Sequence, residues 1–264
     1  MQIKGTFLDE ISHDIPHQNW GEKEWDADFG HMHRAGIEHV ILIRCGYRRW
    51  QTFSSQVLTS EERCYEPPAD LVGMFLRLSE KWGMKFWFGL YDSGKYWASG
   101  DYLHEVELNC RLIDEVWARY GHHAAFGGWY ISQECSRNTG KIIDLYARLG
   151  RHCKAVSGGL PTLISPYIDG SKNISQYTDR TTRTGGVTAE SHEAEWDAIF
   201  RGIQGAVESW PFRTGTSNTT SFRNSSASTS GWPTATAWSA GPTPRPSTAT
   251  CRSSSCRSSG RSCV

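Results

Sequence analysis

The sequence alternates apolar, strand-like segments with amphipathic, helix-like segments five times, and this order restricts the fold more than any other feature. The strand-like segments are residues 3–9, 38–45, 84–91, 124–134 and 160–168. The helix-like segments are residues 25–36, 67–83, 101–120, 139–156 and 189–206. This order is typical of a parallel sheet covered by helices. No GxGxxG or GxxxxGK[ST] motif follows the first strand, so the sequence favours a (β/α)8 barrel over a nucleotide-binding fold.

The composition changes abruptly after Glu208. Residues 209–264 contain no Asp or Glu, six Arg, and 25 Ser or Thr among 56 residues. Such a segment buries too little apolar area to offset the entropy of ordering it. We therefore expect an incomplete α/β barrel of five to six βα units over residues 1–208, and a disordered, low-complexity tail over residues 209–264.

The aliphatic residues are lost where a sixth strand is due, and this leads to a hypothesis about the gene. If the reading frame is shifted back by one base, the possible codons of residues 237–251 permit a strand-like sequence with a Glu near its end. We therefore expect residues 209–264 to be a frameshifted reading of the last strands. Such a chain would lack three βα units and would expose sheet edges, which promotes aggregation.

Charge and cysteine usage limit the partners and the compartment. Residues 1–208 hold all 28 acidic residues but only 22 of the 28 Lys and Arg, a net charge of −6. This acidic body does not favour nucleic-acid binding. Five of the eight Cys lie scattered in residues 1–208 without CxxC spacing, which predicts buried thiols in a reducing compartment. No transmembrane span or signal peptide is visible, which predicts a cytoplasmic chain, or a periplasmic or secreted one if a leader is missing.

Each strand-like segment is followed by polar side chains. These are Asp9 and Glu10, Arg44 and Tyr47, Asp92, Glu134, and Asp169. In a barrel the C-terminal ends of all strands converge on one mouth. Paired carboxylates at such a mouth are the minimum for glycoside hydrolysis, because one protonates the leaving oxygen and the other attacks or activates water.

Each of these candidates also has a purely structural interpretation. Asp9 and Asp92 are equally compatible with helix capping, and Arg44 with a structural ion pair. Glu134 could cap a helix that begins near Ser136. The sequence leaves these alternatives open.

Aromatic residues add candidates for sugar binding. Residues 46–66 form a predicted long loop, and loops of this length are usually functional or disordered. Tyr47, Trp50 and Phe53 in this loop are candidates for stacking on sugar rings, and Tyr130 is a further candidate for substrate contact. Most of the twelve Trp are expected to fill the core.

The histidines do not form a recognisable metal motif. HMH at residues 31–33 and HH at 122–123 are the densest groups, and neither has a carboxylate at a known ligand spacing. We expect no metal and no other cofactor.

The stretch GTFLDEISHDIPHQNWGEKEWDADFGHMHRAGIEHVILIRCGY, followed by GGWYISQE, resembles a bacterial family catalogued as domain of unknown function 4434. The resemblance runs from about Ile3 to Val207. It implies a TIM barrel, a place among the candidate glycoside hydrolases and a saccharide substrate. The family is grouped with the large clan of TIM-barrel glycoside hydrolases. In that clan the usual general acid/base is a Glu after strand four, and this position corresponds to Glu134 here. The usual nucleophile, a Glu after strand seven, has no counterpart.

We therefore predict a carbohydrate-active barrel that lacks its nucleophile and is inactive as a hydrolase. Glu134 is the predicted general acid/base. The predicted substrate-binding residues are Asp9, Glu10, Arg44, Tyr47, Trp50, Asp92 and Tyr130. One alternative is a non-catalytic saccharide-binding barrel. Another is a sugar isomerase or epimerase, which would need a metal that the His pattern supports poorly.

Overall fold

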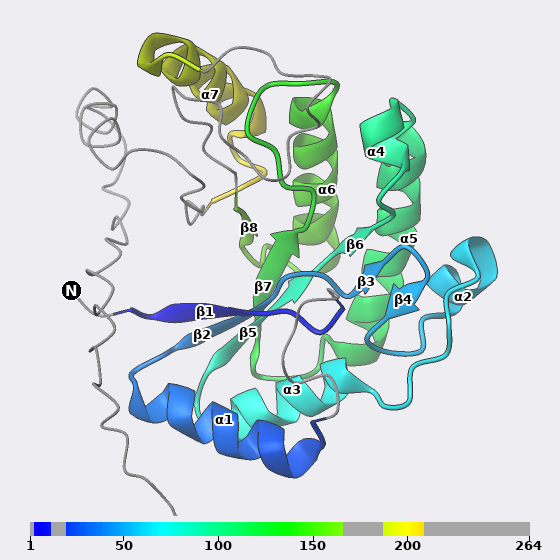
Figure 1. Cartoon of the computed structure of the whole chain (residues 1–264), viewed down its shortest axis with the longest axis vertical. Coiled ribbons are helices and arrows are strands. Elements are labelled where there is room, and N and C mark those ends of the chain that lie inside the picture. The colour runs from blue at the N-terminus through cyan, green and yellow to red at the C-terminus, as the bar shows by residue number, and fades with distance from the viewer. Residues whose placement is uncertain (1–2, 12–19, 166–186, 209–264) are drawn as a thin grey trace, which may run out of the picture.

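The computed structural model describes residues 3–11, 20–165 and 187–208. Its centre is a five-stranded parallel sheet in the order β1-β2-β5-β7-β8. The strands are β1 (Gly5–Leu8), β2 (His39–Leu42), β5 (Lys85–Gly89), β7 (Phe126–Ile131) and β8 (Thr162–Ile164). The sheet curls into half of a barrel (Figure 1). The predicted α/β class and partial barrel are confirmed, whereas the predicted disordered tail lies outside the described residues.

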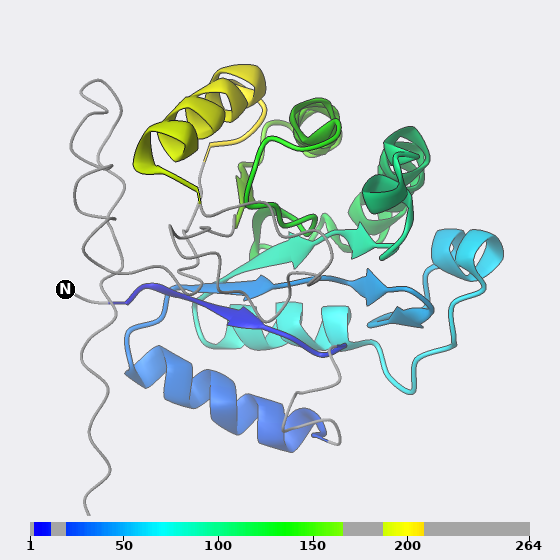
Figure 2. The same cartoon turned by 45° about the horizontal axis from the view of Figure 1, so that its top comes forward.

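Helices follow the curl of the sheet on its outer side (Figures 1 and 2). The long helices are α1 (Glu22–Arg34), α3 (Leu71–Lys81), α5 (Tyr102–Tyr120), α6 (Ile142–Val156) and α7 (Ala189–Ile203). Local sequence sets their ends. Asp70 caps α3 by accepting a hydrogen bond from the amide of Gly73 at 2.9 Å, and the chain leaves this helix through Gly83 at φ +67°.

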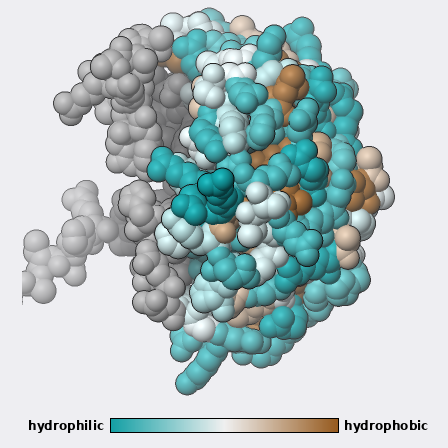
Figure 3. Space-filling view, turned by 90° about the vertical axis from the view of Figure 1, so that its right-hand side faces the viewer, coloured by the Kyte–Doolittle hydropathy of each residue, from teal (hydrophilic) through white to brown (hydrophobic). Residues whose placement is uncertain are grey.

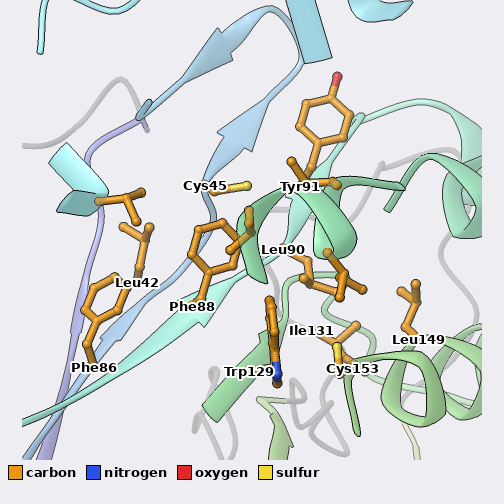
Figure 4. Packing of buried hydrophobic residues seen from close by; sticks show 14 of the residues in the cluster. Leu42, Cys45, Phe86, Phe88, Leu90, Tyr91, Trp129, Ile131, Leu149 and Cys153 are labelled. Atoms are coloured by element: carbon orange, nitrogen blue, oxygen red, sulfur yellow. The ribbon is translucent and has the colours of Figure 1, made fainter. Parts of the chain in front are cut away.

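The outer face of the sheet and the helices enclose the main core. Alternate strand residues point outward, so Phe86, Phe88 and Trp129 lie in this core with no exposed surface (Figure 4). The Trp129 ring meets the Phe88 ring edge-on, with centroids 5.8 Å apart. Its indole Nε1 donates to Ser157 Oγ at 3.1 Å, so a large apolar group is buried with its polar atom satisfied.

The inner face of the sheet has a much smaller apolar cluster. Ile41, Ile43, Tyr130 and Leu163 are buried there, and Phe7 and Trp87 are only partly buried against them. The same alternation that sends Phe86 and Phe88 outward places Trp87 on this inner side.

The predicted loop over residues 46–66 is wrong as a description of the backbone. It contains β3 (Gly46–Tyr47), β4 (Trp50–Gln51) and α2 (Gln56–Glu62). β3 pairs antiparallel with β4 and parallel with β6 (Tyr91–Asp92), which makes a separate three-stranded sheet. These strands are two residues long, too short to produce a recognisable periodicity.

Two further expectations need correction for physical reasons. Phe53 is fully buried against the rings of Phe88 and Tyr120, so it cannot stack on a sugar. The strand predicted over residues 84–91 breaks at Leu90, because Asn109 of α5 takes both backbone groups of Tyr91: its Oδ1 accepts from the amide and its Nδ2 donates to the carbonyl, each at 3.0 Å.

The cysteines of the described residues match their expected role. Cys45, Cys64, Cys135 and Cys153 are free and buried, and Cys110 is free and half-buried. They act as small apolar residues of the core.

Candidate active site

The parallel sheet brings the ends of neighbouring strands to one edge. Asp9 follows β1, Arg44 follows β2, and Glu134 follows β7. Asp92 lies at the end of β6, which continues from β5. The strands pack closely here: a Cβ on Gly89 would lie 2.0 Å from the carbonyl oxygen of Leu42. These polar residues therefore follow adjacent strands at the same, C-terminal edge of the sheet.

Glu134 is oriented by the inner face. The Tyr130 hydroxyl donates a hydrogen bond to Glu134 Oε1 at 2.7 Å, and the buried Tyr130 ring packs edge-on against Phe7 at 5.3 Å. Glu134 as a residue is half-buried. The helix-capping alternative does not hold, because α6 begins at Ile142, far from Ser136, and its N-cap is Lys141.

Arg44, Tyr47 and Asp92 form a second polar group at this edge. Arg44 Nη1 lies 3.9 Å from Asp92 Oδ2, and its guanidinium lies 5.1 Å from the centre of the Tyr47 ring. The other Asp92 oxygen accepts from the amide of Gly94 at 2.8 Å and from Trp97 Nε1 at 3.1 Å. Arg44 Nε is buried and has no hydrogen-bond partner among the residues that the structure describes. The ion-pair interpretation of Arg44 thus holds, but the pair is long and leaves donor capacity unused.

The remaining predicted residues have other contacts in the described structure. Asp9 Oδ1 accepts from the amide of Ile11 at 3.1 Å, a local turn contact, and Glu10 beside it is half-buried. Trp50 is 60% exposed and contacts Tyr65, with ring centroids 5.1 Å apart. Asp169 lies outside the described residues.

A buried carboxylate behind the site was missed from sequence. Glu105 of α5 has no exposed surface. It accepts from the Ser93 amide at 3.0 Å, from the Ser93 hydroxyl, and from Gln133 Nε2 at 2.8 Å. Burial raises the pKa of the Glu105 carboxyl. Because Ser93 follows Asp92 and Gln133 precedes Glu134, Glu105 links the two candidate carboxylates.

The sequence did contain a signal for this residue. Glu105 lies three and seven positions before Leu108 and Leu112, on the apolar face of its helix. A carboxylate on such a face is rarely buried without a specific set of donors. That observation would have identified Glu105 as a residue that organises the strand ends.

Other chemistries find little support at this edge. Burial raises the pKa of the Cys135 thiol to about 11, so this neighbour of Glu134 is a protonated thiol at neutral pH, not an activated nucleophile. Within residues 3–11, 20–165 and 187–208, no three His, Cys, Asp or Glu side chains are placed to hold a metal ion. None of the described helices has the length and apolarity needed to span a membrane.

The arrangement has defined chemical capabilities. The carboxylate of a half-buried residue, held by a phenol, can exchange a proton with a bound group. A guanidinium and a carboxylate one strand away can hydrogen-bond hydroxyl groups of a polar ligand. These are the functional groups that a saccharide site needs.

Comparison with solved structures identifies similar folds. The chain is 54% identical, with a TM-score of 0.75, to a protein described as "a putative alpha-L-fucosidase" from Bacteroides thetaiotaomicron VPI-5482. That match covers 82% of this chain and 65% of the other, so the chain spans just under two thirds of that protein. CbXyn10B shares the fold at 12% identity and a TM-score of 0.51, over 81% of this chain and 65% of the other.

Comparison at the level of families is more direct. A search of curated proteins found no match. The model of one family, described as a domain of unknown function, matches residues 3–224. This match extends to residues 209–224, whereas the sequence resemblance ended near Val207. The proposed frameshift in this region stays a prediction. From the extent of this match, the chain belongs to the DUF4434 family.

Proposed function

We propose that this chain binds an oligo- or polysaccharide at the C-terminal edge of its sheet, in a site of the glycoside hydrolase type. The observation that carries the proposal is the carboxylate of the half-buried Glu134 at the end of β7, held by the Tyr130 hydroxyl at 2.7 Å. The 54% identity to the protein described as a putative alpha-L-fucosidase supports a saccharide ligand. Active sites of barrel enzymes lie at this end of the strands.

In this proposal the side chains have separate roles. Glu134 holds the position of the general acid/base beside the glycosidic oxygen, and Tyr130 orients its carboxyl group. Arg44, Tyr47 and Asp92 bind sugar hydroxyls beside it. Asp9 and Glu10, after the edge strand β1, contact a neighbouring sugar unit.

The proposal treats the chain as a binder that does not complete hydrolysis. The nucleophile that the clan keeps after its seventh strand has no counterpart in the sequence, so the covalent or water-activating half of the reaction has no assigned group. This observation favours the non-catalytic saccharide-binding alternative for the chain as given. Sequencing the gene tests the cause, and stop codons in the shifted frame would contradict a frameshift.

Two assays performed side by side test the proposed function. Titration calorimetry with neutral and acidic oligosaccharides measures binding, and release of reducing sugar measures hydrolysis. We expect binding that weakens in Glu134→Gln, and no release of reducing sugar. If the wild-type chain releases reducing sugar and Glu134→Gln does not, the site assignment stands, but the claim that the chain lacks a nucleophile is refuted. A chain that binds no saccharide would refute the proposal.

A further inference from the structure

Three exposed arginines near the candidate site are not neutralised by a neighbouring carboxylate in the described part of the chain. Arg48, Arg49 and Arg63 are exposed and have no ion pair with any described residue. Nearby acidic side chains are engaged with other elements: Glu61 pairs with Arg111, and Glu62 pairs with Lys95. Glu66, which follows Tyr65, accepts a hydrogen bond from the Ser54 hydroxyl. The three guanidinium groups are therefore left without an ionic partner among the described residues, although residues 46–66 hold three Glu as well as three Arg.

Two exposed aromatic rings lie among these arginines. Trp50 is 60% exposed and Tyr65 is 46% exposed, and their ring centroids are 5.1 Å apart. The Arg49 guanidinium lies 4.3 Å from the centre of the Tyr65 ring. The backbone beneath is hydrogen-bonded, because the Tyr65 amide donates to the Arg49 carbonyl at 2.8 Å and Gln51 Nε2 donates to the Tyr65 carbonyl at 3.0 Å. These hydrogen bonds hold together the two backbone segments that carry the rings.

Two of the arginines occupy backbone positions that favour glycine or asparagine. Arg48 has φ 53° and Arg63 has φ 54°, and no other non-glycine residue of the described chain has positive φ. The Arg48 backbone is fixed there: its carbonyl accepts from the Tyr91 hydroxyl at 2.6 Å, and its amide donates to the Asp92 carbonyl at 3.2 Å. Arg63 is the left-handed C-cap of α2, and Arg48 follows β3, so the backbone sets both φ values. Each position would suit glycine or asparagine better, yet it holds a long cationic side chain.

The location connects this surface to the candidate site. The β3–β4 hairpin lies beyond the C-terminal end of β2 (Figure 2), and Tyr47 of β3 pairs with both Asp92 and Trp50. The side of the molecule that includes β4 and α2 is mostly hydrophilic (Figure 3). A polar ligand fits this side better than an apolar protein partner.

We infer that Arg48, Arg49, Trp50, Arg63 and Tyr65, here called the arginine–aromatic surface, bind a saccharide chain that bears anionic groups. The rings stack on sugar faces, and the guanidinium groups pair with carboxylate or sulfate substituents. The inference rests on the proposed function, and it adds the substrate class: an acidic polysaccharide that runs from this surface toward Glu134.

The test compares acidic and neutral oligosaccharides of equal length on the full chain. Calorimetry with an oligogalacturonate and with a xylo-oligosaccharide is performed at three salt concentrations, and a sulfated oligosaccharide distinguishes sulfate from carboxylate. We expect the acidic ligand to bind about tenfold more tightly at low salt, as charge-assisted hydrogen bonds imply. The difference should shrink as salt rises.

Variants assign the preference to the surface. Arg48→Asn combined with Arg63→Asn should remove the preference for the acidic ligand, because asparagine tolerates positive φ and the fold is kept. Trp50→Ala should weaken the binding of both ligands. Arg151→Gln, which removes an exposed arginine of α6, is the matched control and should change neither affinity. Thermal unfolding confirms that each variant is folded.

Each outcome separates the inference from the proposed function. Equal binding of acidic and neutral ligands, or a preference that persists in the double variant, overturns the inference and leaves the proposed function in place. Absence of binding to every saccharide overturns both. If a DNA oligonucleotide of equal charge binds as tightly and is insensitive to Trp50→Ala, the surface attracts polyanions without specificity and the inference fails.

Discussion

The two faces of the main sheet are built for different purposes. On the outer face, Phe86, Phe88 and Trp129 are completely enclosed by helices. On the inner face, four buried residues support Phe7 and Trp87, which remain partly exposed. Stability depends mainly on the outer face, which leaves the inner face and its strand ends free to carry polar groups. The two faces meet within β7: Trp129 points into the outer core, whereas the hydroxyl of the next residue, Tyr130, donates a hydrogen bond to Glu134.

The largest effect should come from a matched pair of tryptophans on the two faces. Trp129→Ala should lower the free energy of unfolding by about 3–5 kcal/mol, because it leaves a cavity in a closed core and removes the hydrogen bond that Ser157 Oγ accepts from the indole. Trp87→Ala on the inner face should lower it by about 1 kcal/mol, since less apolar area is removed from burial. Urea unfolding measures both. Equal losses would show that the two faces contribute alike.

Glu105 should give the next largest effect and a characteristic pH dependence. Glu105→Gln should lower the free energy of unfolding by about 1–3 kcal/mol, because an amide cannot accept all three donated hydrogen bonds. Burial raises the folded-state pKa above the ordinary value of 4.5. The folded chain therefore holds the proton more tightly than the unfolded chain, and stability falls as pH rises from 4.5 through the folded pKa.

Glu105→Gln should remove this part of the pH dependence. Unfolding followed at several pH values from 4 upward makes the comparison with wild type. If both proteins show the same slope in this window, Glu105 is not the titrating group.

Tyr130→Phe separates packing from function at one position. The ring keeps its contact with Phe7, so stability should change by only about 0.5–1.5 kcal/mol, the usual value of one hydrogen bond. Saccharide affinity should fall, because Glu134 loses the donor that orients it. Calorimetry on the two proteins provides the measurement, and unchanged affinity would argue that Tyr130 only fills space.

Trp50→Ala should have the smallest effect on stability. Its side chain is mostly exposed, so the free energy of unfolding should change by less than about 0.5 kcal/mol. Saccharide binding should weaken. A large loss of stability with unaltered binding would mark Trp50 as a core residue.

The sequence was sufficient to predict the fold because its strands are short apolar runs that alternate with amphipathic helices. Periodicity located the parallel sheet and the segment that ends in Glu134. It failed for β3, β4 and β6, which are two residues long. Phe53 was misassigned for a different reason: its burial depends on contacts with α5 and β5 that local pattern does not encode.

The candidate site was predictable to a smaller extent. Strand order alone indicated that Arg44, Asp92 and Glu134 follow neighbouring strands. The contacts that organise them were not predictable, because the Tyr130–Glu134 hydrogen bond and the Glu105 network depend on side-chain geometry between elements distant in sequence.

A crystal structure of the chain with a bound oligosaccharide tests the central claim most directly. We predict sugar units along the C-terminal ends of β5 and β7, with a Glu134 carboxylate oxygen within hydrogen-bond distance of a glycosidic oxygen and with Arg44 or Asp92 contacting hydroxyl groups. A saccharide bound on the outer helices, or one that leaves Glu134 without contact, would contradict the assignment of this edge as the active site.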